Sequence, residues 1–326
     1  REILERCISI DPNIKVVAKA ADPFEARDKI IKYQPDVITL DIEMPKMNGL
    51  EFLRRLIPQY PIPVVVISSL SSKVFDALNS GAVDFLTKPD INSPQGLESF
   101  INELIIKIKI ASTANLASRQ NNLVASRFIS NNHLNLGHKV IAMGASTGGT
   151  EAIYNIIKSL PKNIPGIVIT QHMPAGFTRM FAERLNNSTL LEVREAKPGD
   201  LIKTGYVFIA PGEQHMIVKK RGQELVIDCF KGEKINGHCP SIDVLFESVA
   251  KHVGANSIGV ILTGMGYDGA KGLLAMRKQG ARTIGQDEQS SIVYGMPKVA
   301  FSLGAVEKQT ALKNIAPTII SLLNGE

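Results

Sequence analysis

Short apolar runs alternate with amphipathic stretches along the first third of the chain. Apolar side chains recur at helical spacing between the runs, as in the stretch that begins with Asp22-Pro23, a typical helix start. The runs predicted as strands are 14–20, 36–40, 63–67 and 83–86. The segments predicted as later helices are 49–57, 73–80 and 99–110. Such alternation favours a parallel sheet covered on both faces, and therefore an α/β domain over 1–110.

The first residues of the chain do not fit the start of such a domain. Ile3, Leu4, Cys7 and Ile8 lie at helical spacing, and no apolar run precedes them. An α/β domain of this kind normally begins with a strand. We therefore expect a five-stranded domain that is truncated at its N-terminus and lacks its first strand.

A second α/β pattern follows a polar stretch. Residues 111–138 are rich in Asn and Ser and are predicted to be a linker, with a short helix around 123–128. From residue 139 the predicted strands are 140–144, 167–171, 191–194, 206–210, 258–263 and 282–286. Two further runs, 215–220 and 224–230, flank Arg221-Gly222 and predict a β-hairpin. The expected fold is two doubly wound parallel-sheet domains, flavodoxin-like over 1–110 and Rossmann-like with a hairpin over 139–326.

Composition places the chain among globular proteins of the cytoplasm. Hydrophobic residues make up 44% and charged residues 21% of the sequence, and no apolar run approaches the roughly 20 residues that cross a bilayer. The cysteines, Cys7, Cys229 and Cys239, are odd in number and form no C-x-x-C pair. Disulfides and structural zinc are not expected, and a reducing cytosol fits.

The net charge of +6 is unevenly distributed. Residues 1–110 carry 14 basic and 15 acidic side chains, and the remainder carries 23 and 16. A basic second half could favour nucleic acid or an acidic protein surface, but we favour the simpler interpretation of a lysine-rich solvated exterior. The sequence has no zinc-finger spacing and no RNA-binding aromatic signature, so we expect no nucleic-acid partner.

Three polar residues end successive predicted strands of the first domain. Asp41 follows the run DVITL, Ser68 ends the next run, and Lys88 ends the one after. The carboxyl ends of parallel strands form a ligand crevice, so the three side chains can converge. A lone Asp is usually a cap, but a phosphoryl group on Asp41 would need a hydroxyl and an ammonium of this kind.

These residues resemble the receiver domains of bacterial two-component signalling. The matching stretches are D-I-E-M-P-x-M-N-G at 41–49, V-I-S-S at 66–69 and G-A-V-D-F-L-T-K-P at 81–89. The resemblance implies that Asp41 accepts phosphate, that Ser68 follows the phosphoryl group, that Lys88 pairs with it and that Phe85 is the switching aromatic. It also implies a Mg²⁺ site with Asp41 as a ligand, whose other acidic ligands would lie in the missing first strand. Either the chain is truncated there, which we favour, or this receiver does not bind Mg²⁺ in the usual way.

The second domain opens on a possible nucleophile motif. Gly144-Ala145-Ser146-Thr147-Gly148-Gly149 follows a predicted strand, opens a helix and fits G-x-S-x-G. A phosphate-binding loop would need a lysine here, and a dinucleotide fingerprint would need another glycine. A small-residue turn without chemistry is about as probable on this motif alone.

His172 and Asp268 also come at the ends of predicted strands. With Ser146 they could form a triad in which His172 takes the serine proton and Asp268 orients the imidazole. The chain order Ser, His, Asp disfavours an α/β-hydrolase, whose order is Ser, Asp, His. The remaining histidines are predicted to be structural or on the surface, although His238 could approach the site. They are His133, His138, His215, His238 and His252.

The second half resembles the catalytic domain of the chemotaxis protein-glutamate methylesterases, the CheB family. The matching stretches are G-A-S-T-G-G at 144–149, Q-H-M-P at 171–174, A-P-G-x-x-H-M at 210–216, P-S-I-D-V-L-F at 240–246 and G-M-G-x-D-G-A at 264–270. The resemblance implies Ser146, His172 and Asp268 as the triad, and the Met265 N–H as an oxyanion donor.

The same resemblance implies the substrate and the partners. The substrate would be glutamate methyl esters on methyl-accepting chemoreceptors, with receptor glutamines as a further substrate in some members. The partner that phosphorylates the receiver would be a chemotaxis histidine kinase, and no membrane insertion is implied. The alternative hypothesis is a non-enzymatic response regulator with a protein-binding output domain.

Overall fold

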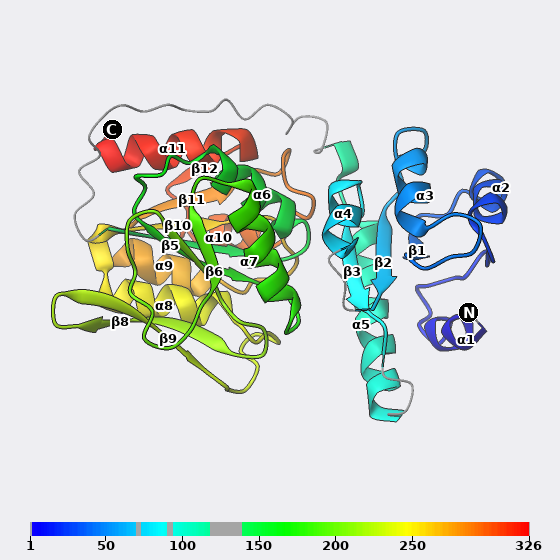
Figure 1. Ribbon diagram of the computed structural model, residues 1–326, viewed down its shortest axis with the longest axis horizontal. Coiled ribbons are helices and arrows are strands. Elements are labelled where there is room, and N and C mark those ends of the chain that lie inside the picture. Colours follow the sequence, from blue (N-terminus) through cyan, green and yellow to red (C-terminus); the bar gives the residue numbers. More distant parts are fainter. Residues whose placement is uncertain (1, 70–72, 90–93, 118–138, 326) are drawn as a thin grey trace. The chain divides into compact units, whose positions relative to one another are not determined.

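The computed structural model describes residues 2–69, 73–89, 94–117 and 139–325. The chain divides into two compact units, Arg1–Leu116 and Ala117–Glu326, both of which are drawn in Figure 1. The linker helix predicted around 123–128 lies outside the described residues. No described helix combines the length and apolar character that crossing a bilayer requires.

Unit 1 is a small parallel sheet with helices around it. Its strands are β1 (Ile38–Asp41), β2 (Val64–Ser68) and β3 (Asp84–Thr87), hydrogen-bonded in the order β1-β2-β3. Its helices are α1 (Glu2–Ile8), α2 (Pro23–Tyr33), α3 (Gly49–Leu56), α4 (Lys73–Asn79) and α5 (Pro94–Ser112). Every residue of the central strand β2 is buried, which explains its continuous apolar run.

The start of α2 forms as its sequence predicts. The Asp22 carboxylate accepts hydrogen bonds from the backbone N–H groups of Phe24 and Glu25, and Pro23 occupies the first turn, where no intrahelical N–H partner is needed. Gln34 ends the helix in the left-handed conformation, with φ of 44°. The helix boundaries therefore follow from local capping chemistry.

One predicted strand is absent. Residues 14–20 form no strand in the structure, although IKVVAKA is rich in β-branched residues. In the flavodoxin-like order the second strand pairs only with the first. The described part of unit 1 has no strand beside this segment, so its backbone groups have no ladder to join, and the β-propensity of the side chains does not compensate.

Unit 2 is built on a seven-stranded sheet. The order is β12-β11-β10-β4-β5-β7-β6, and every neighbouring pair is parallel. The strands are β4 (Val140–Ala145), β5 (Gly166–Gln171), β6 (Glu192–Glu195), β7 (Tyr206–Ile209), β10 (Ser257–Ile261), β11 (Arg282–Gln286) and β12 (Lys308–Thr310). The six predicted strands are present within two residues of their expected bounds. The predicted hairpin is also present, as the antiparallel pair β8 (His215–Arg221) and β9 (Glu224–Phe230).

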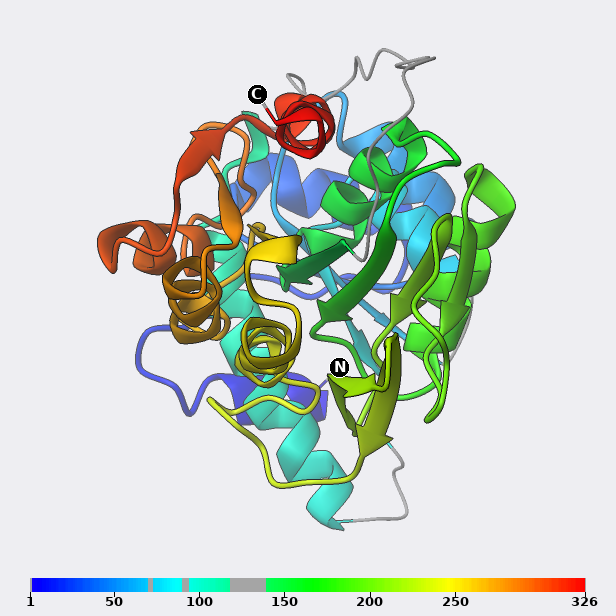
Figure 2. The ribbon, with the colours of Figure 1, turned by 90° about the vertical axis from the view of Figure 1, so that its left-hand side faces the viewer.

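Helices cover both faces of this sheet. They are α6 (Gly149–Ser159), α7 (Phe177–Ser188), α8 (Ile242–His252), α9 (Ala270–Lys278), α10 (Met296–Ser302) and α11 (Leu312–Asn324). Figure 2 shows α11 and α8 nearly end-on, with strands of the sheet between them. In Figure 1, α6 and α11 lie together on one side of the sheet, and α8 and α9 lie on the other.

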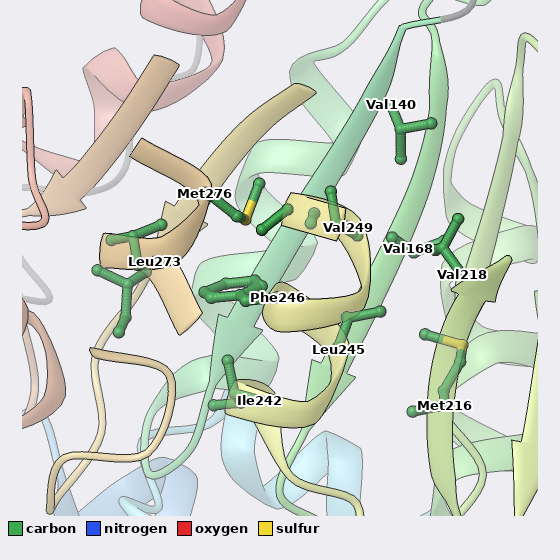
Figure 3. Close-up of a cluster of buried hydrophobic side chains, with 14 of the residues drawn as sticks. Val140, Val168, Met216, Val218, Ile242, Leu245, Phe246, Val249, Leu273 and Met276 are labelled. Carbon is green, nitrogen blue, oxygen red and sulfur yellow. The ribbon is translucent and has the colours of Figure 1, made fainter. Parts of the chain in front are cut away.

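Helix α8 is fixed by a large apolar cluster between the sheet and the hairpin (Figure 3). Phe246, at the centre of its inner face, is fully buried, and α9 packs against the same face. The side chains of β4, β5 and β8 that meet α8 include Val140, Val168, Met216 and Val218. Truncating a buried Phe of this kind to Ala typically costs about 3–5 kcal/mol of stability. The packing matters for function because the N-terminus of α8 faces the candidate site.

Candidate functional site

The candidate site lies where the strand order of unit 2 reverses. After β4 the chain adds β5, β7 and β6 on one side, and later β10, β11 and β12 on the other. Ligands of open α/β sheets bind beyond the carboxyl ends of strands at such a switch point. Ala145 pairs with Gln171, and the His172 N–H donates to the Ala145 carbonyl at 3.1 Å. Ser146 and His172 therefore leave neighbouring strands side by side.

The turn that carries Ser146 is fixed by backbone bonds. The Ser146 N–H donates to the Thr263 carbonyl at 3.0 Å, and the Gly149 N–H donates to the Ser146 carbonyl at 2.7 Å. Gly148 has φ of +77°, and a Cβ on it would lie 2.7 Å from the Cβ of Ile292. Only glycine fits there, so the glycines of the motif create a sharp strand-to-helix turn that leaves Ser146 partly exposed.

His172 and Asp268 form a buried pair. The imidazole Nε2 lies 2.8 Å from Asp268 Oδ2, and the two side chains are 7% and 1% exposed. Nδ1 of His172 is buried and has no hydrogen-bond partner among the described residues. The imidazole orientation is thus opposite to that of the chymotrypsin-type triad, in which Nδ1 binds the aspartate. The nitrogen left for a serine proton is Nδ1.

Asp268 is held by many donors. Its carboxylate accepts from the His172 ring, the Asn236 amide, the Ser241 hydroxyl and the backbone N–H groups of Ile242 and Asp243. Burial raises its pKa, but the hydrogen bonds and the charge interaction with His172, together with the Asn236 and Ile242 bonds, outweigh burial and hold the pKa well below its usual range. The N-terminus of α8 contributes in the same direction. Asp268 is therefore a fixed anion.

A second buried carboxylate lies beside it. Asp243 accepts from the Gly272 N–H at 2.7 Å, and the Asn236 amide lies 2.7 Å from Asp243 Oδ2 and 2.8 Å from Asp268 Oδ1. Burial raises the pKa of Asp243, and the nearby Asp268 charge adds to the effect. Of the two carboxylates, Asp268 is the one that contacts the imidazole.

The predicted oxyanion donor lies on the adjacent loop. Gly264 donates to the Val293 carbonyl at 3.0 Å, and a Cβ on Gly264 would come within 2.6 Å of Ser146 Cβ. The next residue, Met265, therefore follows a backbone segment that touches Ser146. Its N–H has no hydrogen-bond partner among the described residues. The loop can therefore offer this donor to a substrate oxygen.

Three neighbours contact the pair, and of these only His238 was expected from the sequence to approach the site. The His238 ring stacks on the His172 ring, and Asn236 and Ser241 donate to Asp268. All three belong to the segment between β9 and α8. The only signals in the sequence were the position of Ser241 in P-S-I-D-V-L-F and a histidine close to that motif.

The candidate phosphoacceptor site of unit 1 is more open. Lys88 Nζ lies 3.0 Å from Asp41 Oδ2 and 3.1 Å from Glu43 Oε2, and the Lys88 and Asp41 side chains are 34% and 41% exposed. Burial lowers the pKa of Lys88, but the bonds to Asp41 and Glu43 outweigh it and raise the pKa. Ser68 is buried at the end of β2, and the Lys88 N–H donates to its carbonyl at 2.8 Å.

Phe85, the predicted switching aromatic, is buried on β3. Lys107 Nζ lies 5.9 Å from the centre of its ring and 2.8 Å from Asp84 Oδ1. The structure thus brings Asp41, Ser68 and Lys88 to the carboxyl ends of three neighbouring strands, whereas Phe85 lies inside its strand. Phe85 is therefore buried, and its role as a switching aromatic stays a prediction.

The described residues do not make up a complete Mg²⁺ site. Asp41 and Glu43 are the carboxylates near Lys88, and both are paired with its ammonium group. Within the described ranges no three acidic, histidine or cysteine residues are grouped as metal ligands. Mg²⁺ binding at Asp41 stays a prediction.

Comparison with known proteins follows this division into two units. Residues 141–319 match the family model of the CheB methylesterase, and residues 1–100 match that of the response regulator receiver domain. The chain belongs to the CheB methylesterase family. The family assignment confirms the expected fold class and hydrolase activity, and it favours the enzyme over the binding-module alternative.

CheB relatives align along nearly the whole chain. The protein-glutamate methylesterase/protein-glutamine glutaminase 2 of Syntrophomonas wolfei is 59% identical over 325 residues, covering 99% of this chain and 94% of the relative. The protein-glutamate methylesterase/protein-glutamine glutaminase of Salmonella typhi is 44% identical over 329 residues, covering 100% and 94%. The crystal structure of the Thermotoga maritima CheB catalytic domain has a TM-score of 0.56 and 37% identity, covering 57% of this chain and 99% of that one.

Proposed function

We propose that this CheB family member is a phosphorylation-activated serine hydrolase that removes methyl esters from glutamate side chains of chemoreceptors. The observation that carries the proposal is the buried His172–Asp268 pair beside Ser146. The names of the relatives, protein-glutamate methylesterase/protein-glutamine glutaminase, supply the substrate class. The receptor partner is therefore a methylated chemoreceptor.

The proposed hydrolysis uses His172 Nδ1 as the base, because Nε2 is bonded to Asp268. Ser146 Oγ attacks the ester carbonyl while His172 Nδ1 takes its proton, and the Asp268 carboxylate stabilises the resulting imidazolium through Nε2. The Met265 N–H binds the oxyanion. Methanol leaves with the proton from Nδ1, and the serine is left as a glutamyl ester. Water then attacks that ester with Nδ1 as base, which restores Ser146 and releases the glutamate.

The same steps apply to an amide substrate. A glutamine side chain presents the same carbonyl, and ammonia would leave in place of methanol. Some CheB relatives carry the glutaminase name, which supports receptor glutamines as a second substrate. Measuring ammonia release from unmodified receptor fragments tests this extension directly.

Regulation would come through Asp41. A phosphoryl group adds close to two negative charges, which would draw the Ser68 hydroxyl toward Asp41 and draw Lys88 away from its present contact with Glu43. A chemotaxis histidine kinase is the proposed phosphate source, and Mg²⁺ is the proposed cofactor of the transfer. A phosphorylation assay with and without a chelator tests the metal requirement.

The decisive assay is methanol release from methylated receptor fragments, with and without a small phosphodonor. Ser146→Ala should lose at least about 10⁴-fold of the rate, as expected for a nucleophile. Ser188→Ala, an exposed serine at the end of α7, should behave as wild type. No release from the folded wild-type protein under either condition would favour the binding-module alternative.

A further inference from the structure

His238 covers one face of the candidate base. Its ring centroid lies 3.6 Å from that of His172, and the two ring planes are 11° apart. This is close to parallel stacking, and it involves two residues that are 66 positions apart in the sequence. His238 takes no part in the proton transfers described above, but it touches the candidate base directly and can act on catalysis through it.

Hydrogen bonds hold the segment that carries His238 on both sides of this residue. The N–H and C=O groups of Ile235 and His238 bond to each other at 3.0 and 2.9 Å around a tight turn, in which Asn236 and Gly237 have φ of 52° and 83°. Positive φ at both central residues is the requirement of a type I′ turn. Ser241 follows and donates to Asp268 at 2.7 Å.

Asn236 ties the same turn to the site from the other side. Its amide group lies 2.8 Å from Asp268 Oδ1. Asp268 therefore binds residues before and after His238 as well as His172 itself. Hydrogen bonds to Asp268 thus hold both the His172 ring and the segment that carries the His238 ring. The distance between the two rings is therefore fixed by the fold.

His172 needs such support because its ring has one anchor. Nε2 bonds to Asp268, and Nδ1 has no partner in the described part of the chain. The torsion that turns an imidazole about its Cβ–Cγ bond is broad, so a single hydrogen bond does not by itself fix the tilt of the ring. A flat ring stacked on one face removes that freedom.

We propose that His238 is a positioning residue for the hydrolase, one that holds the His172 imidazole in the plane that directs Nδ1 toward Ser146. The proposal rests on the proposed triad but goes beyond it, because it assigns to the turn at residues 235–238 a part in catalysis. A base displaced by about 1 Å can cost about 10²-fold in rate.

The test compares three replacements of one ring. His238→Phe keeps a flat ring, His238→Leu keeps apolar bulk without planarity, and His238→Ala removes both. We expect kcat for methyl ester hydrolysis to fall about 10- to 100-fold in the Leu and Ala variants, with KM within about twofold. The Phe variant should recover to within about threefold of wild type. His252→Ala, at the opposite end of α8, is the matched control and should change neither constant.

A second readout separates this proposal from the choice of substrate. The rate at which a fluorophosphonate labels Ser146 requires the oriented base but no receptor fragment, and it should follow the same order, wild type, Phe, then Leu and Ala. If the wild-type protein is labelled but releases no methanol, the methylesterase proposal is overturned. The labelling rates of the His238 variants can then still be compared. Equal rates for Leu and Phe, an unchanged Ala variant, or a raised KM with normal kcat would each overturn the positioning role.

Discussion

The two candidate sites occupy the same place in their sheets but are built differently. Asp41 ends β1 and Asp268 lies in the loop after β10, yet the Asp41 side chain is 41% exposed and that of Asp268 is 1% exposed. Asp41 accepts from the Glu43 N–H at 2.9 Å and pairs with one ammonium group, which it shares with the Glu43 carboxylate. Asp268 accepts from five donors, two of them at the start of α8.

The difference follows from what each carboxylate has to do. An acceptor of a phosphoryl group must be reached by its donor and must let its cation move, and an ion pair as exposed as Lys88–Asp41 contributes only about 0–1 kcal/mol. A carboxylate that orients a base must stay fixed and charged. Removing a partner from a buried charge costs about 3–5 kcal/mol, so the Asp268 cluster resists rearrangement.

The largest expected effect is the loss of charge at Asp268. Asp268→Asn should reduce kcat for methanol release about 10⁴-fold, because the imidazolium loses its counter-ion and the tautomer of His172 is no longer enforced. Asp228→Asn, a half-buried carboxylate on the hairpin and outside the site, is the control and should keep its activity. A loss of kcat smaller than about 100-fold would mean that Asp268 is structural. The difference in burial between Asp41 and Asp268 would then have no bearing on catalysis.

The second expected effect is confined to regulation. Asp41→Asn should abolish the stimulation by phosphodonor while leaving unstimulated hydrolysis within about twofold of wild type. Thermal stability should change by less than about 1 kcal/mol, since only an exposed ion pair is lost. Asp36→Asn, exposed just before β1, should keep the stimulation. Stimulation that persists without Asp41 would place the phosphoacceptor elsewhere.

A third, smaller effect concerns pH. The lowered pKa of Asp268 means that its ionised form stabilises the folded state. That contribution is fully present above the unfolded-state value of 3.8 and is lost as pH falls from there toward the lowered pKa of the folded state. Urea unfolding should therefore show wild type more stable than Asp268→Asn near neutral pH, with the difference shrinking below about pH 4. A difference that grows on acidification would contradict the assigned direction.

Sequence reasoning went furthest where the chemistry depends on strand ends. His172 and Asp268, each predicted at the end of a strand, are in contact in the structure, and Ser146 and His172 follow neighbouring strands. Their roles as a triad stay a prediction. The choice of Nδ1 could not be predicted, because it depends on where the start of α8 places Asp268 relative to the ring. His238 was noticed but given no role, since its stacking depends on a turn anchored by residues distant in the sequence.

Errors in the predicted strands have a related cause. Residues 14–20 have the composition of a strand but no neighbour to pair with, whereas β12 has three residues and little apolar pattern but joins an existing edge. Whether these segments form strands depends on a neighbouring strand with which they can pair, and the local sequence pattern does not reveal that neighbour. The reactivity of the cysteines could not be predicted from the sequence either, because it depends on how deeply each thiol is buried.

The last and smallest expected effect uses these thiols to compare the two units. Burial, followed by the charge of Asp228, raises the pKa of Cys229 on β9 to about 12, whereas Cys7 on α1 is only half-buried. At neutral pH the thiolate fraction of Cys229 is then roughly 10⁻⁵, so a thiol reagent should modify Cys7 in the native protein and leave Cys229 untouched. With rising urea, modification of Cys229, followed by mass spectrometry, should begin only when unit 2 unfolds, because its side chain belongs to the α8 core cluster. The variant Cys229→Ser identifies the peptide. Modification of Cys229 before that of Cys7 would show that the hairpin opens independently of the core. That result would contradict the inference that the site of unit 2 resists rearrangement more than that of unit 1.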